Sequence, residues 1–411
     1  MIRSGASGGM LGAGYYTATL TPPGERKTGA ARAEEMRQQY AMLTADHLTP
    51  IVNAGVYTDL PLFLSPTPIR HDRGQVLEES WTRHLRARPD DPPEAWGGPL
   101  AQTFDELRDG EVAGWRPSLI FSPMLVEDGR RLLVSNLDLR WVASNDGALL
   151  GGNPADPERQ RGFAMNYSQE AFELFRLFPD ARRTFRLSTA TGMSASFPFF
   201  SRAVSLPTWP RRRVVDAGYY DNYGVSVITS WLFSGRNAEW IRENVSKVLI
   251  VQIRDGVSDE YRQLQNVEAD QSTPLSRAVE EFFTPLEGLD SGRVGSASFR
   301  NDGQLEQLSG HYRELKGQSV RTDQMDRFLT TITFEFPIPA SLSWYLSGRE
   351  REAIDVLARG ETGTEYGAAV GRRERFLEGL QDTELHKNLR KAMGQLDQRF
   401  DDLRMWWWTQ P

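Results

Sequence analysis

Short apolar runs separated by turn residues mark the strand candidates in the middle of the chain. Residues 118–126 and 131–139 are two such runs, and Glu127-Asp128-Gly129 between them has the composition of a turn. This pattern predicts a β-hairpin. Residues 213–215 predict a short strand that leads into Asp216. Residues 245–253 form a nearly continuous apolar run, which is typical of a strand buried on both faces of a sheet.

Helical patterns precede and follow these strands. Small and apolar residues from 8 to 16 predict a helix packed closely on a sheet, and residues 225–233 predict a second helix. Apolar residues recur at helical spacing over 275–286 and again over 385–403. Residues 328–336, with the sequence FLTTITFEF, predict a late strand.

The order of these elements predicts an α/β fold in two parts. Residues 1–255 form the first part, in which the polar and interrupted segment from about 25 to 115 is a helical insertion or lid. A loop is expected over residues 143–162, which are rich in Gly, Asn, Pro and Asp. Residues 256–411 form a mainly helical extension with one late strand, packed on the core.

Composition and charge limit the classes of protein that remain. With 39% hydrophobic and 25% charged residues among 411, the chain has the composition of a folded globular protein. Its net charge of −7 argues against a nucleic-acid partner, which would require clustered Lys and Arg. The absence of cysteine excludes disulfides, thiolate nucleophiles and Cys-ligated zinc.

The longest apolar stretch is too short to span a membrane, and no secretory signal is recognisable. We therefore expect a soluble chain, in the cytoplasm or at the periphery of a membrane. Met405-Trp406-Trp407-Trp408 could provide a peripheral membrane contact, because indole rings prefer the bilayer interface; packing against the last helix is the alternative.

A candidate nucleophile lies near the start of the chain. Gly5, Ala6, Ser7, Gly8 and Gly9 form a G-x-S-x-G pattern directly before the first predicted helix. In a nucleophile elbow this pattern places the serine on a sharp strand-to-helix turn, where its hydroxyl is exposed. The flanking glycines leave room for the tight turn, and backbone N–H groups at the helix N-terminus can stabilise an oxyanion. Ser7 is therefore the candidate nucleophile, and Gly5, Gly8 and Gly9 are the candidate elbow and oxyanion residues.

A serine nucleophile needs a base, and the five histidines do not provide an obvious one. None of His47, His71, His84, His311 and His386 lies in a recognisable triad context or in metal-ligand spacing. A desolvated carboxylate can replace imidazole if it lies within hydrogen-bond reach of the hydroxyl. Asp216 is the candidate, because it follows an apolar strand, at the edge where open α/β sheets place their sites.

Taken in order, these segments resemble the patatin-like phospholipase family. The resemblance rests on the G-x-S-x-G elbow at Gly5–Gly9, on Val215-Asp216-Ala217-Gly218 with Asn222, which is similar to the family's D-G/A-G segment, on the small-residue and proline stretch Thr191–Pro198, and on the hairpin Leu125–Val134. It covers roughly residues 1–255. The family's three-layer fold, with a mostly parallel central sheet, is therefore expected for this part.

The resemblance implies a lipid acyl hydrolase that cleaves phospholipids or other acyl esters without a cofactor or a metal ion. Asp216 would remove the proton from Ser7, and Ser7 would attack the ester carbonyl to give an acyl-enzyme that water hydrolyses. Ala217, Gly218 and Asn222 would shape the loop after Asp216.

One element of the family is not recognisable. Its glycine-rich oxyanion loop normally lies on the strand before the elbow, and only six residues precede Ser7. The chain is therefore expected to start inside the domain and to be a poor catalyst by itself. A non-catalytic lipid-binding or interaction protein is the alternative function, and a general esterase with a Ser, His and Asp triad is another.

Overall fold

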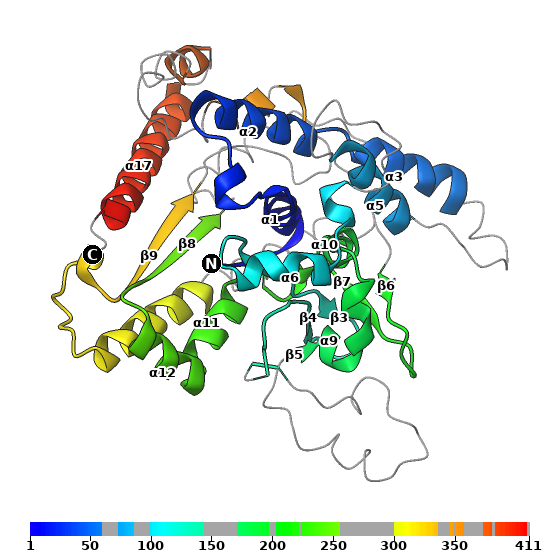
Figure 1. Ribbon diagram of the computed structural model, residues 1–411. Coiled ribbons are helices and arrows are strands. Elements are labelled where there is room, and N and C mark those ends of the chain that lie inside the picture. Colours follow the sequence, from blue (N-terminus) through cyan, green and yellow to red (C-terminus); the bar gives the residue numbers. More distant parts are fainter. Residues whose placement is uncertain are drawn as a thin grey trace, which may run out of the picture. The chain divides into compact units, whose positions relative to one another are not determined.

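The computed structural model (Figure 1) describes most of the chain as two compact units, Met1–Asn237 and Ala238–Pro411. The described residues are 1–59, 73–85, 98–140, 142–143, 171–196, 203–221, 223–254, 300–335, 346–348, 351–352, 354, 356, 373–379 and 383–408. The division precedes the strand at residues 248–254, whereas the sequence placed the end of the first part at residue 255. The boundary at residue 255 stays a prediction.

The stretch 118–125 organises the strands of the first unit. Its first half, β2 (Ser118–Ile120), pairs in parallel with β1 (Ile2–Ser4). Its second half, β3 (Met124–Leu125), pairs antiparallel with β4 (Arg131–Leu133) and with β7 (Arg213–Val215). The predicted hairpin and the predicted strand before Asp216 are confirmed.

The largest sheet has the strand order β5-β4-β3-β7-β6. β5 (Ala171–Glu173) is parallel to β4, and β6 (Val204–Ser205) is antiparallel to β7. The strands of the described residues thus form small, mixed sheets, and the expected mostly parallel central sheet is not seen among them. The antiparallel hairpin β3–β4 and its pairing with β7 are the reason. The α/β class itself is confirmed.

Helices of the first unit cover these strands. α1 (Ser7–Thr19) packs on α10 (Leu187–Ser194), and the close approach is at Gly14, where a Cβ would lie 3.6 Å from Thr191 Oγ1. α11 (Val225–Phe233) contributes Val227 to an apolar core with Ile120 and Leu133. The helices predicted at residues 8–16 and 225–233 are both confirmed.

The polar segment after α1 is helical, as predicted. Its described elements are η1 (Pro23–Glu25), α2 (Gly29–Leu43), α3 (Leu48–Ala54), the π-helical turn η2 (Gly55–Asp59), α5 (Arg73–His84), η3 (Pro99–Ala101) and α6 (Phe104–Val112). α3 packs on α5, and two histidines meet there. His47 Nδ1 and Ser80 Oγ lie 3.0 Å apart, and the His47 and His84 rings meet edge to face.

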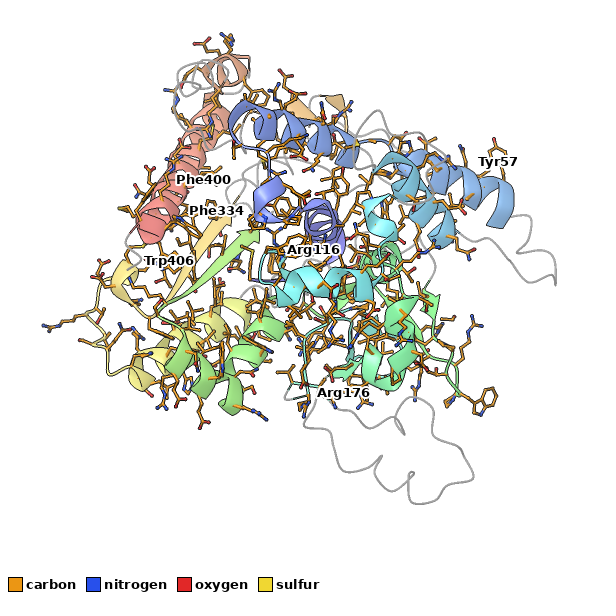
Figure 2. All side chains as sticks on the ribbon, viewed as in Figure 1. Tyr57, Arg116, Arg176, Phe334, Phe400 and Trp406 are labelled. Atoms are coloured by element: carbon orange, nitrogen blue, oxygen red, sulfur yellow. The ribbon has the colours of Figure 1, made fainter. Side chains whose placement is uncertain are left out.

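The second unit is built on a parallel pair of strands. β8 (Val248–Arg254) and β9 (Leu329–Glu335) pair along their whole length, with α17 (Thr383–Trp408) packed along β9 (Figure 1). Phe334 and Phe400 connect strand and helix with ring centroids 4.8 Å apart (Figure 2). A helix over residues 300–315 and α12 (Gly235–Asn244), which crosses the division between the units, are also described.

Two strands and one helix predicted for this region are confirmed, with one correction. The strand at residues 245–253, the late strand and the C-terminal helix correspond to β8, β9 and α17. The prediction that the first of these is buried on both faces is wrong, since Val251 is 44% and Ile253 66% exposed. Val251 and Ile253 lie on one face of β8, whereas Gln252, which points to the other face, is buried, so only the face with Val251 and Ile253 is exposed. The helix predicted at 275–286 and most of the predicted loop 143–162 lie outside the described residues.

The aromatic end of the chain belongs to α17. Trp406 is buried, whereas Trp407 and Trp408 are 69% and 83% exposed. Contact of these two indole rings with a membrane stays a prediction. None of the described helices is both long and apolar enough to cross a bilayer.

Acid should destabilise the fold through His47. Burial, reinforced by the nearby His84, lowers the pKa of His47 to about 4, from about 6.5 in an unfolded chain. Between these values the unfolded chain takes up the proton and the folded chain does not, so stability is lost as pH falls. By pH 5 the loss should be roughly 2 kcal/mol.

The replacement His47→Gln should remove this contribution. Urea unfolding of both proteins at pH 7 and pH 5 measures it, and the pH-dependent loss should be smaller in His47→Gln. An equal loss in both proteins would show that His47 is not the group that titrates.

Candidate active site

The ends of β1 and β7 lie on the same side of the stretch 118–125, a few residues apart. β4 contacts one side of this stretch, through the pairs Phe121↔Val134 and Met124↔Arg131. β1 and β7 therefore pair with its other side, and they run towards each other. β1 ends opposite Ile120, and β7 ends opposite Met124. The chain segments that carry Ser7 and Asp216 thus leave their strands a few residues apart.

Ser7 has the backbone conformation of a nucleophile elbow. Its φ angle is +48°, and no other non-glycine residue in the described ranges has a positive φ. Such a conformation costs on the order of 1–3 kcal/mol and is concentrated at functional sites. Ser7 is the first residue of α1 and follows the end of β1 by three residues, so the turn runs from strand to helix as the G-x-S-x-G pattern requires.

The N-terminus of α1 next to Ser7 is open to a ligand. No side chain caps this helix, and its first turn contains no acidic residue. A Cβ added at Gly8 or Gly9 would meet nothing within 4 Å, so both glycines border open space. Gly5 instead packs on Met10, whose sulfur would lie 3.5 Å from an added Cβ. The backbone N–H groups at this end of α1 can therefore stabilise a developing negative charge.

Asp216 follows β7 directly and is only 4% exposed. Its Oδ1 accepts a hydrogen bond of 2.6 Å from the backbone N–H of Gly218. The next residues form the short 3₁₀ helix η5 (Ala217–Tyr219), in which Ala217 is buried. Ala217 and Gly218 therefore form the turn that holds the carboxylate, and their role in a catalytic loop stays a prediction. Asn222 lies outside the described residues.

The end of the Asp216 loop lies against the elbow. Gly224 has a φ of +66°, and a Cβ added to it would lie 2.4 Å from the Gly5 nitrogen and 2.6 Å from Gly5 Cα. Only a glycine leaves room for this approach of two backbones. The contact connects the loop after Asp216 with the turn that carries Ser7.

A buried polar cluster, which the sequence did not predict, contacts the same loop. The Arg131 guanidinium donates a 2.7 Å hydrogen bond to Ser226 Oγ and lies 4.7 Å from the Tyr220 ring centroid. Asp221 accepts hydrogen bonds from the backbone N–H groups of Tyr223 and Ser226. Arg131 belongs to the hairpin run LVEDGRRLLV, where one arginine among several charged residues gives no signal of burial.

The described histidines contact residues outside the Ser7 turn and the Asp216 loop. His47 and His84 flank Ser80 in the insertion, and His311 meets Tyr312 in the second unit with ring centroids 5.7 Å apart. His71 lies outside the described residues, and the side chain of His386 is not described. In the described part of the chain, no group of three or more His, Asp and Glu side chains could hold a metal ion.

Comparison with known proteins adds no assignment. No protein-family model matches the chain, and no curated protein matches it significantly in sequence. The resemblance to patatin-like phospholipases therefore rests on the residues quoted above.

The Gly224 contact should be intolerant of a side chain. In Gly224→Ala the new Cβ would overlap the Gly5 backbone, and the alanine would have to adopt a positive φ. We therefore expect the free energy of unfolding to fall by at least about 2 kcal/mol. Gly12→Ala is the matched control, because Gly12 lies in α1 with nothing within 4 Å of an added Cβ. Gly12→Ala should raise the free energy of unfolding by roughly 0.5–1 kcal/mol. Urea unfolding measures both changes, and a neutral Gly224→Ala would show that the loop does not lie against the elbow.

Proposed function

We propose that the chain is a serine acyl hydrolase of the patatin-like type, which cleaves phospholipids or other acyl esters. The observation that carries the proposal is the positive φ of Ser7 on a strand-to-helix turn. The backbone contact between Gly224 and Gly5 supports Asp216 as its partner, because it brings the Asp216 loop to that turn.

In this mechanism Asp216 is the general base. A carboxyl group removed from water takes up a proton more readily than a solvated one, and Asp216 is almost completely buried. It would accept the hydroxyl proton of Ser7 while the oxygen attacks the ester carbonyl. The leaving alcohol would then take that proton, and Asp216 would activate the water that hydrolyses the acyl-enzyme.

The oxyanion of each tetrahedral intermediate would be stabilised at the start of α1. Gly8 would donate a backbone N–H, and the uncapped helix N-terminus would add its partial positive charge. Gly9 would leave space for the substrate, since its position borders open space. No step requires a cofactor or a metal ion.

The positions of the other segments that resemble the family also support the patatin-like assignment. The hairpin that resembles the family's is β3–β4, and its first strand pairs with the strand that leads to Asp216. The small-residue stretch begins within α10, which packs on α1 and contacts η5. The patatin-like three-layer fold is proposed on these placements, together with the elbow.

Hydrolysis of a fluorogenic ester tests the Ser7–Asp216 pair. Because nucleophile and base act as one unit, Ser7→Ala, Asp216→Asn and the double variant should each lose at least about 10³-fold in turnover, with no further loss in the double variant. Ser80→Ala is the matched control, because Ser80 lies between His47 and His84 in the insertion. It should keep the activity of the unchanged protein.

Each of three other results would contradict the proposal. Activity that survives Ser7→Ala excludes Ser7 as nucleophile. A loss of turnover on substitution of a histidine alone favours the triad esterase. A folded chain without any turnover, which still binds lipid, favours the non-catalytic alternative.

A further inference from the structure

A cavity in the first unit is separate from the Ser7 turn. It measures about 240 Å³, and its polar lining residues are Arg108, Ser135, Asn136, Asp138, Glu173, Arg176 and Arg182. Its walls follow the carboxyl ends of the parallel strands β4 and β5. Both strands lie on the opposite side of the stretch 118–125 from β1 and β7. The volume is below the usual range of pockets for drug-sized ligands, so a small ligand fits best.

One of the three arginines is occupied by carboxylates. Arg176 projects from α9 (Leu174–Leu177; Figure 2), with its Nε 2.6 Å from Glu173 Oε2 and an Nη 3.0 Å from Asp138 Oδ1. Arg176 therefore closes one wall together with these two carboxylates, and Arg140 forms a further ion pair with Asp138.

The other two arginines form no ion pair with a described residue. Arg108 of α6 has no hydrogen bond or ion pair with any described residue. Arg182 of η4 (Pro179–Arg183) lies with its guanidinium 5.1 Å from the Phe175 ring centroid. Its Nε is buried and has no hydrogen-bond partner among the described residues. Two cationic side chains thus border the cavity in a chain whose net charge is −7.

The nearby carboxylate compensates them only in part. Glu111 is hydrogen-bonded by the Asn136 side chain and interacts electrostatically with Arg108 and Arg182, but burial raises its pKa to about 7. Burial therefore favours the uncharged form of this carboxyl group, compared with a solvated glutamate. An anion that keeps its charge can replace it as the partner of the two arginines.

Two uncharged side chains indicate what kind of anion fits. Ser135 Oγ accepts the N–H of Leu137, so its hydroxyl hydrogen remains to be donated. Asn136 donates 2.6 Å to the Phe104 carbonyl, whereas its buried Oδ1 has no hydrogen-bond partner among the described residues. The cavity thus offers several donors and, besides the carboxylates of Asp138 and Glu173, one buried amide oxygen that has no partner among the described residues. A carboxylate or a sulfate cannot donate to that acceptor, but a phosphate that retains a proton can.

We propose that this cavity binds a phosphate group, with Arg108, Arg182 and Ser135 as donors and Asn136 Oδ1 as the acceptor for its P–OH. The group could be free inorganic phosphate or the monoester of a small molecule. The proposal does not depend on the hydrolase function.

Calorimetric titration of the full chain at neutral pH and fixed ionic strength tests the site. Inorganic phosphate should bind, and Arg108→Gln and Arg182→Gln should each weaken it at least tenfold. Arg183→Gln is the matched control, because Arg183 is the exposed neighbour in η4 and does not line the cavity. It should change the affinity less than threefold. Sulfate should bind at least fivefold more weakly than phosphate.

Further titrations identify the source of the phosphate and the role of Glu111. Glycerol 3-phosphate binding more tightly than inorganic phosphate would indicate a monoester, and the reverse would indicate the free ion. Glu111→Gln should bind phosphate as tightly as the unchanged chain or more tightly.

Several outcomes would overturn the proposal. Absence of binding at about 10 mM phosphate excludes the site. Equal weakening in Arg183→Gln and Arg182→Gln would show general charge attraction, and equal affinity for sulfate would remove the role of Asn136. Thermal melting of each variant checks that it is folded, so that a loss of affinity is assigned to the cavity.

Discussion

The candidate active site depends on a contact between two glycine backbones. Gly224 approaches Gly5 so closely that a Cβ on Gly224 would overlap the Gly5 nitrogen. Through this contact, the loop that begins at Asp216 ends on the turn that carries Ser7. Because main-chain atoms meet directly, their separation is set by van der Waals radii and does not vary with side-chain rotamers. Such a contact can hold a nucleophile and a base at a fixed distance.

The same loop is held by polar groups that are buried. Arg131 contacts Tyr220 and Ser226, and Asp221 accepts hydrogen bonds from the N–H groups of Tyr223 and of Ser226 in the first turn of α11. Arg131 is almost completely buried, so an arrangement of the loop that removed these contacts from its guanidinium would be costly. The strain at Ser7 persists because both sides of the turn are fixed in this way.

Much of this arrangement could be predicted from the sequence. The elbow and the hairpin have local signatures, since glycine spacing and turn residues determine them within a few positions. Gly224 and Arg131 have no such signature, because their roles arise from residues that are distant in the sequence. The exposed face of β8 escaped prediction for a related reason: an apolar run shows that a strand can be buried, but not which elements cover it. Pairing across the stretch 118–125 is likewise a long-range property.

The most direct test of the account is to map the residue that a fluorophosphonate probe modifies in the folded chain. Mass spectrometry of the digested adduct should find the label on Ser7, and labelling should be lost in urea and strongly slowed in Asp216→Asn. A label on Ser80 would contradict the account, because that serine lies between His47 and His84 in the insertion. A folded chain that takes up no label would contradict it as well.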